Sequence, residues 1–583
     1  MKRLGGILIA VALFGWLTRF GYQSTHVENA HRLALAIDTL ASEDAAISHQ
    51  LVVEFRDGES ATQRLALAHK FGVEFTAESK FSDVDEIFVV HSDDPERLLA
   101  GLRAEPEVAA SDFDFVYRLP ESVVAATAGT PEVAQPGFPN DPKFKLQWHL
   151  DQIHIKPAWK TAQGDGVIVA VIDTGVAPVP DLAASDLVAG YNFVSNREDA
   201  RDDHGHGTHV AGTIAQATNN GIGVAGIAFG AKIMPIKVLS ARGSGSVSGI
   251  AAGIRFAADH GAKVINMSLG GGLASSVLQK AVSYAHDKGV TVVCAAGNDG
   301  RGKVSYPAAY VGAIAVAATQ FDESTTFYSN WGKEIDLAAP GGNTRVDQNG
   351  DGFPDGVLQN TVVPGDVNKN DYLWFMGTSM ASPHVAGVAA LVISAGVSEP
   401  DAVEKVLLSS ARKPSAKPKD GENRYGSGLL DAEQAVKKAK LEFGGWQLAF
   451  GFAAAALLGW YRRAKFGFGG MLALVFGSSG LFFLPGTSLL SRSFADLLPG
   501  NPLFLSALFP LLLIAIGYSV KRLRGALTGF ALGVGATLLF HALFRTVDVR
   551  FVPNFLDGAW LCLNAALLFT VGSLTLRNRD SLQ

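Results

Sequence analysis

The stretch Val167-Ile-Val-Ala-Val-Ile-Asp173-Thr-Gly175 is an unbroken apolar run that ends on an acid and a glycine. An apolar run without alternation predicts a strand that is buried on both faces, as in a parallel sheet covered by helices. The active residues of such sheets gather where the strands end, at their carboxyl edge. Asp173 is therefore a candidate active-site residue.

Similar apolar runs alternate with alanine-rich helical stretches between about residues 138 and 442. Strands are predicted at Val167–Ile172, Lys232–Val238, Val264–Met267, Thr291–Ala295 and Ala313–Ala317, and helices at 207–217, 246–260, 274–288, 380–394 and 400–411. This alternation predicts a doubly wound α/β fold with a mostly parallel sheet.

Two further motifs place a histidine and a serine at predicted helix starts. They are Asp203-His-Gly-His206-Gly-Thr-His209 and Gly377-Thr-Ser379-Met-Ala-Ser382. Serine is a weak nucleophile until an imidazole takes its proton, and the imidazole needs a carboxylate to fix its tautomer. Asp173, His206 and Ser379 can supply these three roles from three separate loops.

These motifs resemble those of the subtilisin family of serine peptidases, from about residue 138 to residue 440. The resemblance implies that Asp173 orients His206, that His206 acts as general base and acid, and that Ser379 attacks the peptide carbonyl. Val293-Cys-Ala-Ala-Gly297-Asn298 resembles the family's oxyanion motif, so Asn298 and the Ser379 backbone N–H would stabilise the oxyanion. The implied activity is endoproteolysis through an acyl-enzyme, without a cofactor for catalysis.

The resemblance also implies which residues bind the substrate. Ser268-Leu269-Gly270 resembles one edge that pairs with the substrate backbone, and Gly243-Ser244-Gly245 resembles the opposite edge. Ser305 would lie at the base of the pocket for the residue before the scissile bond. Met376 stands where the family usually has a small residue, so we expect a narrower approach to Ser379.

Two segments are candidate loops for structural calcium. Residues 343–372 are an insertion relative to a typical subtilisin. Part of this insertion resembles an EF-hand loop, because oxygen ligands occupy positions one, three, five and nine: Asp347, Asn349, Asp351 and Asp355. Leu358 stands at the position of the Glu that closes an EF-hand loop. The alternative for this segment is an acidic surface turn. The segment 219–224 resembles a calcium loop of the family, which implies Asn220 and Asp181 as ligands.

Two other functions fit parts of the sequence. His204, His206 and His209, with Asp202 and Asp203, could hold zinc, but no further ligand or base accompanies them and the serine motif would go unexplained. The second alternative is an inactive peptide-binding module, which the complete triad and Asn298 disfavour. His209 and His384 are interpreted as packed core histidines.

Residues 49–118 alternate strand and helix signals in the order β-α-β-β-α-β, which predicts a small ferredoxin-like α+β unit. This unit resembles the family's inhibitory propeptide, whose tail would occupy the active site until it is cut. A permanent accessory domain is the alternative. Residues 119–137 are rich in Pro, Ala, Thr and Gly, as a linker is, and the cut is expected within 117–137.

Both ends of the chain are apolar, which raises the mean hydropathy to +0.20. Residues 1–24 have the basic start and apolar run of a signal peptide or an uncleaved signal anchor. In the region 443–583, five apolar segments are long enough to cross a bilayer: 443–460, 467–488, 499–520, 525–544 and 558–576. They predict an all-α transmembrane bundle.

Lys and Arg follow the first, third and fifth of these segments, which places those loops in the cytoplasm and residues 25–442 outside it. We therefore expect a multi-pass protein of the cytoplasmic (inner) membrane with an extracytoplasmic or periplasmic peptidase domain. Its expected partners are protein or peptide substrates, its own propeptide and the lipid bilayer. A membrane-protein partner held by the spans would make it a narrow processing peptidase instead of a general degrader.

Charge and cysteine content exclude other classes. The formal net charge is −6 and no basic stripe occurs, so we expect no nucleic-acid partner. The two cysteines, Cys294 and Cys562, lie in different regions and predict neither a disulfide framework nor a cysteine-held zinc.

Overall fold

The structure is a computed structural model that describes residues 49–119, 137–182, 187–415, 423–441, 449, 451, 453, 468–478, 506–517, 520, 523–544 and 556–577. The predicted signal segment lies outside the described residues. So do nearly all of the linker 119–137 and most of the first predicted span.

A seven-stranded sheet forms the centre of the peptidase region. Its strands are β6 (Ile168–Asp173), β7 (Tyr191–Asn192), β8 (Lys232–Lys237), β10 (Val264–Met267), β11 (Thr291–Ala295), β12 (Ala313–Thr319) and β13 (Leu337–Pro340). Their order is β13-β12-β11-β10-β6-β8-β7, and all neighbours are parallel. The predicted α/β fold is confirmed, and the five predicted strands lie within two residues of their positions. The short strands β7 and β13 were missed.

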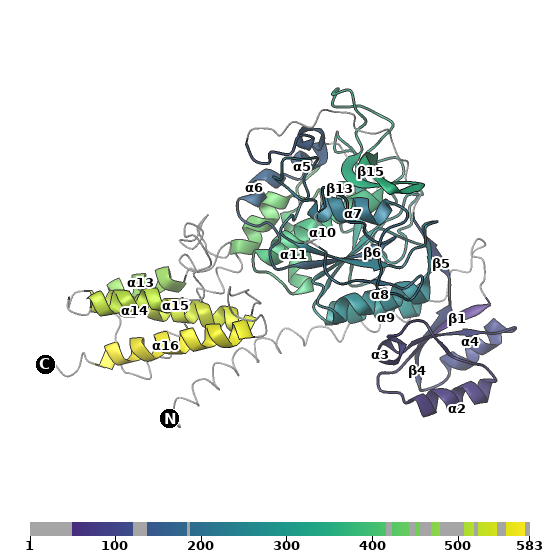
Figure 1. Ribbon diagram of the computed structural model, residues 1–583, viewed down its shortest axis with the longest axis horizontal. Helices are drawn as coiled ribbons and strands as arrows, with labels where there is room; N and C mark the ends of the chain where they lie inside the picture. Colours follow the sequence, from purple (N-terminus) through teal and green to yellow (C-terminus); the bar gives the residue numbers. More distant parts are fainter. Residues whose placement is uncertain are drawn as a thin grey trace. The chain divides into compact units, whose positions relative to one another are not determined.

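Helices cover both faces of this sheet (Figure 1). Alternate residues of β6 show why: Val169 and Val171 pack into one buried cluster with α7 (His206–Ala215), α10 (Thr378–Ser394) and α11 (Pro400–Ser410). Ala170 and Ile172 pack into a second cluster with α8 (Val247–Asp259) and α9 (Ser276–Asp287). A strand with two buried faces must be apolar throughout, as the sequence of β6 is.

The segment 49–113 forms an α+β unit with a buried core of its own. Its elements are β1 (Gln50–Phe55), α2 (Ala61–Phe71), β2 (Thr76–Ala77), α3 (Ser82–Asp85), β3 (Ile87–His91), α4 (Pro95–Arg103) and β4 (Val108–Phe113). The strands pair antiparallel in the order β2-β3-β1-β4, which is a ferredoxin-like arrangement. The predicted last strand, 108–117, is divided: β4 ends at Phe113, and β5 (Val116–Arg118) pairs with the peptidase region.

The insertion predicted at 343–372 ends in an antiparallel hairpin of β14 (Val357–Val363) and β15 (Asp366–Phe375). Gly365 lies in the turn with φ +86°. Because β15 ends four residues before Ser379, the hairpin leads directly into the serine motif.

The C-terminal region contributes the helices α13 (Phe468–Ser478), α14 (Leu508–Gly517), α15 (Arg524–Phe544) and α16 (Asp557–Arg577). Among the described residues, one helix, Arg524–Leu543, is long and apolar enough to cross a membrane by length and composition, and 72% of its apolar window is buried. The described helices therefore do not support a five-span bundle.

Candidate active site

Three predicted catalytic side chains come from elements at the carboxyl edge of the sheet. Asp173 ends β6, His206 begins α7, and Ser379 is the second residue of α10. All three are fully buried. The Asp173 Oδ1 and His206 Nδ1 atoms lie 2.8 Å apart, so the carboxylate fixes the ring and leaves Nε2 as the reactive nitrogen.

The start of α7 is held by an acid that precedes it. The Asp202 carboxylate accepts the backbone N–H groups of His204 and Gly205 (2.9 Å each) and both the N–H and the hydroxyl of Thr208. The Thr174 hydroxyl also donates to it, at 2.8 Å. The Thr208 N–H belongs to the first turn of α7, and His204 and Gly205 directly precede it, so this carboxylate fixes the chain on both sides of His206.

This arrangement disfavours the zinc alternative. Asp202 is occupied as a helix cap, and His209 lies one turn along α7, where its Nε2 contacts backbone carbonyls. No group of three or more His, Cys, Asp or Glu side chains in the described part of the chain could hold a metal ion.

Ser379 and His206 do not share a hydrogen bond in this structure. The Ser379 hydroxyl donates to the Ser268 carbonyl at 3.2 Å, and the Ser268 hydroxyl donates back to the Ser379 carbonyl at 2.8 Å. His206 Nε2 is buried and has no hydrogen-bond partner within the described residues. Catalytic hydrogen bonds of unliganded sites commonly tighten when the substrate binds.

Asn298 presents a free donor beside Ser379. Its Oδ1 accepts the N–H (2.9 Å) and the hydroxyl (2.8 Å) of Thr378, which fixes the orientation of the amide. Its Nδ2 is buried without a partner in the described structure. A Cβ atom on Gly377 (φ +152°) would lie 3.1 Å from this nitrogen, so the glycine keeps the approach to the donor open.

The two predicted substrate edges lie on either side of one segment of the chain. Strand β5 pairs antiparallel with β9 (Ser244–Ser246), which places Tyr117 opposite Gly245. On its other side, Arg118 exchanges two 3.2 Å backbone hydrogen bonds with Gly270, and the Leu119 N–H donates to the Gly243 carbonyl at 2.8 Å. The segment 116–119 is thus the middle strand of three.

The remaining predicted substrate residues lie nearby. Leu269 and Ser305 are buried, and a Cβ atom on Gly297 would lie 2.4 Å from Ser305 Oγ, so this hydroxyl packs against the asparagine motif. The buried Tyr117 side chain donates its hydroxyl to the Leu273 carbonyl at 2.6 Å, a contact that sequence reasoning missed.

Two acidic residues that the sequence analysis did not single out connect the N-terminal unit to the starts of two helices. Asp114 accepts the backbone N–H and the hydroxyl of Ser248, both at 2.8 Å, at the start of α8. Asp112 does the same for Ser276 at the start of α9, at 2.6 and 2.7 Å. Carboxylates are stabilised at helix N-termini, and a serine at the start of a predicted helix was the available signal.

The predicted calcium residues fall into two loops. Asp347 accepts the N–H groups of Gly350, Asp351 and Gly352, and Asp355 is fully buried with an Oδ1 that lacks a partner in the described structure. In the other loop, Asp181 accepts the Asn220 side-chain amide at 2.8 Å and the Val224 N–H at 2.9 Å.

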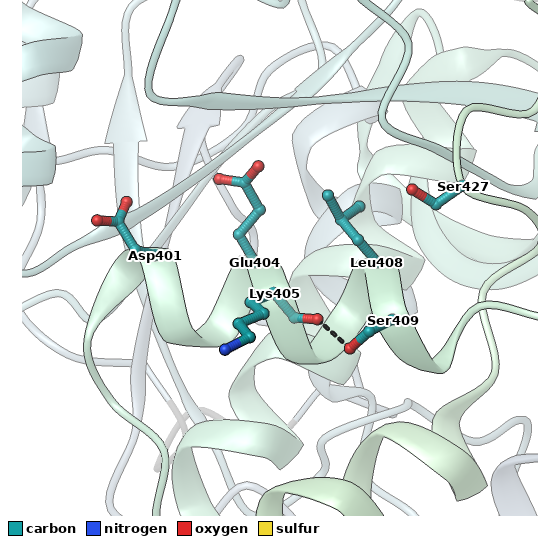
Figure 2. A pocket seen from close by; sticks show the side chains of 6 residues that line it. All are labelled: Asp401, Glu404, Lys405, Leu408, Ser409 and Ser427. Atoms are coloured by element: carbon teal, nitrogen blue, oxygen red, sulfur yellow. Dashed lines mark hydrogen bonds between the residues drawn. The ribbon is translucent and has the colours of Figure 1, made fainter. Parts of the chain in front are cut away.

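A surface hollow lies away from all of these residues. It is lined by Asp401, Glu404, Lys405, Leu408, Ser409 and Ser427 (Figure 2). None of the predicted site residues lines it. We therefore do not assign it to the catalytic site.

A buried acid–imidazole pair, a nearby serine and a free amide donor define a serine peptidase site. The comparisons with known proteins place the chain in a family. A profile described as "Subtilase family" matches residues 164–435. The chain is 43% identical over 260 residues to thermitase of Thermoactinomyces vulgaris, covering 44% of this chain and 86% of that protein. It is also 43% identical over 293 residues to subtilisin Savinase of Lederbergia lenta, covering 50% of this chain and 99% of that protein.

Two similar proteins match a longer part of this chain. An extracellular protease of Xanthomonas campestris is 38% identical over 390 residues, which is 59% of this chain and 62% of that protein. The crystal structure of fervidolysin from Fervidobacterium pennivorans, a keratinolytic enzyme related to subtilisin, is 25% identical and covers 68% of this chain and 62% of its own, with a TM-score of 0.55. The chain belongs to the subtilase family, and it is a subtilisin-like serine endopeptidase.

Proposed function

We propose that Ser379 is the nucleophile, that His206 is the general base and acid, that Asp173 orients His206, and that Asn298 stabilises the oxyanion. The observation that carries this assignment is the 2.8 Å contact of Asp173 with His206 Nδ1, which leaves Nε2 without a partner in the described structure. The unpaired amide nitrogen of Asn298 supports the fourth role.

The reaction follows from these positions. When a peptide lies between the two edges, His206 Nε2 takes the Ser379 proton as the oxygen adds to the peptide carbonyl. The carbonyl oxygen becomes negative and is met by Asn298 Nδ2 and the Ser379 N–H, which are in place before the charge forms. His206 then gives its proton to the leaving amine, and water releases the acyl group by the same steps.

The test compares two alanine variants of the same helix. Ser379→Ala should abolish hydrolysis of casein, whereas Ser394→Ala, which removes a hydroxyl from the far end of α10, should retain it. Casein hydrolysis by folded Ser379→Ala that disappears with a chelator would favour a metal-dependent site instead.

The N-terminal unit is the second part of the proposal. We infer that residues 49–118 are an inhibitory propeptide, because the segment 116–119 occupies the place between the edges that a substrate backbone would take. A permanent accessory domain would occupy the same place without being cut.

Mass spectrometry of the purified protein tests self-processing. Wild type should begin at a residue within 117–137, whereas Ser379→Ala should retain residues 49–118. Retention of residues 49–118 by fully active wild type would favour the accessory domain.

We propose structural calcium for the loop at 347–355, where the carboxylates are not gathered as a preformed metal site: among the described residues, no group of three or more His, Cys, Asp or Glu side chains could hold a metal ion. The unpartnered, buried Oδ1 of Asp355 fits a cation held with Asp347, Asn349 and Asp351. In the other loop, the Asp181 oxygens accept the Asn220 amide and the Val224 N–H, so that loop lacks the unpartnered carboxylate oxygen that Asp355 offers. The ion would stiffen the insertion and take no part in the chemistry. Calcium should raise the melting temperature of Ser379→Ala, and Asp355→Asn should remove most of this rise.

We further propose that the region 443–583 anchors the peptidase to a membrane, with residues 25–442 outside the cytoplasm. The charge asymmetry of the connecting segments and the apolar helix Arg524–Leu543 support this. Deletion of 443–583 distinguishes two roles. A general degrader should keep its activity on casein and on its natural substrate, whereas a partner-guided peptidase should lose the natural substrate.

A further inference from the structure

The hairpin β14–β15 contacts the chain on both sides of His206 and continues into the residues that precede Ser379 at the start of α10. Its second strand ends at Phe375, four residues before Ser379. Its first strand passes Gly205, the residue before His206. One hairpin therefore connects the histidine helix to the serine motif.

The contact at Gly205 needs a glycine. The Thr361 hydroxyl donates a short hydrogen bond to the Gly205 carbonyl, which also accepts the first helical N–H, from His209, at 3.2 Å. A Cβ atom on Gly205 would lie 2.4 Å from the Val362 carbonyl oxygen, and its φ is +100°. The missing side chain lets β14 pack directly on the backbone beside the catalytic histidine.

The second contact is His209, three residues after His206 on α7. Its Nε2 lies 3.1 Å from the Val357 carbonyl and 3.1 Å from the Leu373 carbonyl, one on each strand of the hairpin. Its ring stacks on Phe375 at 4.2 Å and 7°. Because both neighbours of Nε2 are acceptors, this nitrogen carries the hydrogen and bonds the helix to both strands.

We propose that Thr361 and His209 are positioning residues that set the separation between His206 Nε2 and Ser379 Oγ. The inference rests on the catalytic roles proposed above. Neither side chain needs to touch the substrate. Thr361 holds the backbone before His206, and His209 holds α7 against Phe375, the last residue of β15, which lies four residues before Ser379. A misplacement of about 1 Å between reacting groups costs up to about 100-fold in rate. We therefore expect the loss of either contact to lower the rate by changing the distance between His206 Nε2 and Ser379 Oγ.

A merely structural role makes a different prediction. A packed core side chain that is replaced by one of similar shape lowers stability and leaves the chemistry of the folded fraction unchanged. A positioning residue changes kcat per active site and the acid limb of the pH profile, which reports the ionisation of the catalytic imidazole.

The experiment uses the full chain in detergent and a short chromogenic peptide, with active sites counted by a serine-reactive fluorophosphonate. Thr361→Val keeps the shape and removes the hydroxyl, whereas Thr361→Ser keeps the hydroxyl. We expect Thr361→Val to lower kcat about 10-fold, to leave KM within about 2-fold and to move the acid limb. Thr361→Ser should restore kcat to within about 2-fold.

Two more variants complete the set. His209→Phe keeps a stacking ring without a donor and should behave as Thr361→Val does; it also serves if Thr361→Val does not fold. The control is Thr213→Val, which removes another buried hydroxyl from α7, one whose hydrogen bond stays within the helix and goes to the His209 carbonyl at 3.2 Å. It should lower the melting temperature and leave kcat and the acid limb in place.

The proposal is overturned if folded Thr361→Val and His209→Phe lose stability but keep the wild-type kcat and pH profile. That result would leave the catalytic assignment intact. Activity that survives in His206→Ala would instead overturn the proposed function itself.

Discussion

Asn298 illustrates how one side chain is prepared for a charge that does not yet exist. Its carbonyl end is held by two donors from Thr378, so the amide nitrogen points into the site without having to reorganise. Such fixed donors contribute most when the oxyanion forms, because they are oriented before the charge develops and the amide nitrogen is shielded from water. The residue therefore acts on the transition state more than on substrate binding.

We expect Asn298→Leu to lower kcat and to leave KM nearly unchanged. Loss of the equivalent donor costs a subtilisin about 10²–10³ in kcat, and the same range is expected here for hydrolysis of a short peptide. A change in KM alone would show that Asn298 binds the ground state instead.

Helix α7 is the element on which the histidine depends. Five donors converge on the Asp202 carboxylate at its start, and the insertion hairpin contacts it from the other side. Sequence reasoning placed the helix within two residues and named Asp202 only in the zinc alternative that it disfavoured. It interpreted His209 as a packed core histidine, which the burial of that side chain confirms, but its carbonyl partners lie 148 and 164 residues away.

Removal of the cap should destabilise this element. Asp202→Ala is expected to lower the free energy of unfolding by about 1–3 kcal/mol, because several buried donors lose their acceptor. Thermal unfolding in the Ser379→Ala background measures this without self-digestion. Glu198→Ala, which removes an acid whose side chain is 84% exposed, four residues earlier, should stay within about 0.5 kcal/mol of its parent.

At the scale of the whole molecule, several carboxyl groups lie where the N-terminal unit contacts the peptidase region. Burial raises the pKa of Glu78 to about 7, with the Asp114 charge adding to it, and burial raises the pKa of Asp85 to about 7. Burial also raises the pKa of Asp114 to about 6. Arg255 offsets part of this negative charge through its ion pair with Glu54. The contact between the N-terminal unit and the peptidase region is therefore most stable when these carboxyls are protonated.

The pH dependence follows with a definite sign. Groups whose pKa is higher in contact than in water bind protons on association, so the contact is strongest below about pH 4, where the groups are protonated in both states, and weakens as the pH rises from there to about 7. In Ser379→Ala, hydrogen exchange of the Ser248 amide, which donates to Asp114 across this contact, corrected for its intrinsic pH dependence, should accelerate at least about tenfold between pH 5.5 and pH 8. The double variant Glu78→Gln, Asp85→Asn should reduce this change, and an equally large acceleration in it would contradict the prediction.

The sequence by itself determined the elements and the motif residues of this subtilase. Apolar runs specify buried strands, and Asp173, His206 and Ser379 follow from local patterns at strand ends and helix starts. Only the tertiary structure decided that β5 leaves its own sheet to lie between Gly245 and Gly270, and that Asp202 caps a helix. It also decided that one hairpin contacts both the histidine helix and the serine motif. The physical reason is that these contacts join residues far apart in the chain, whose pairing depends on packing and hydrogen-bond geometry that no local pattern specifies.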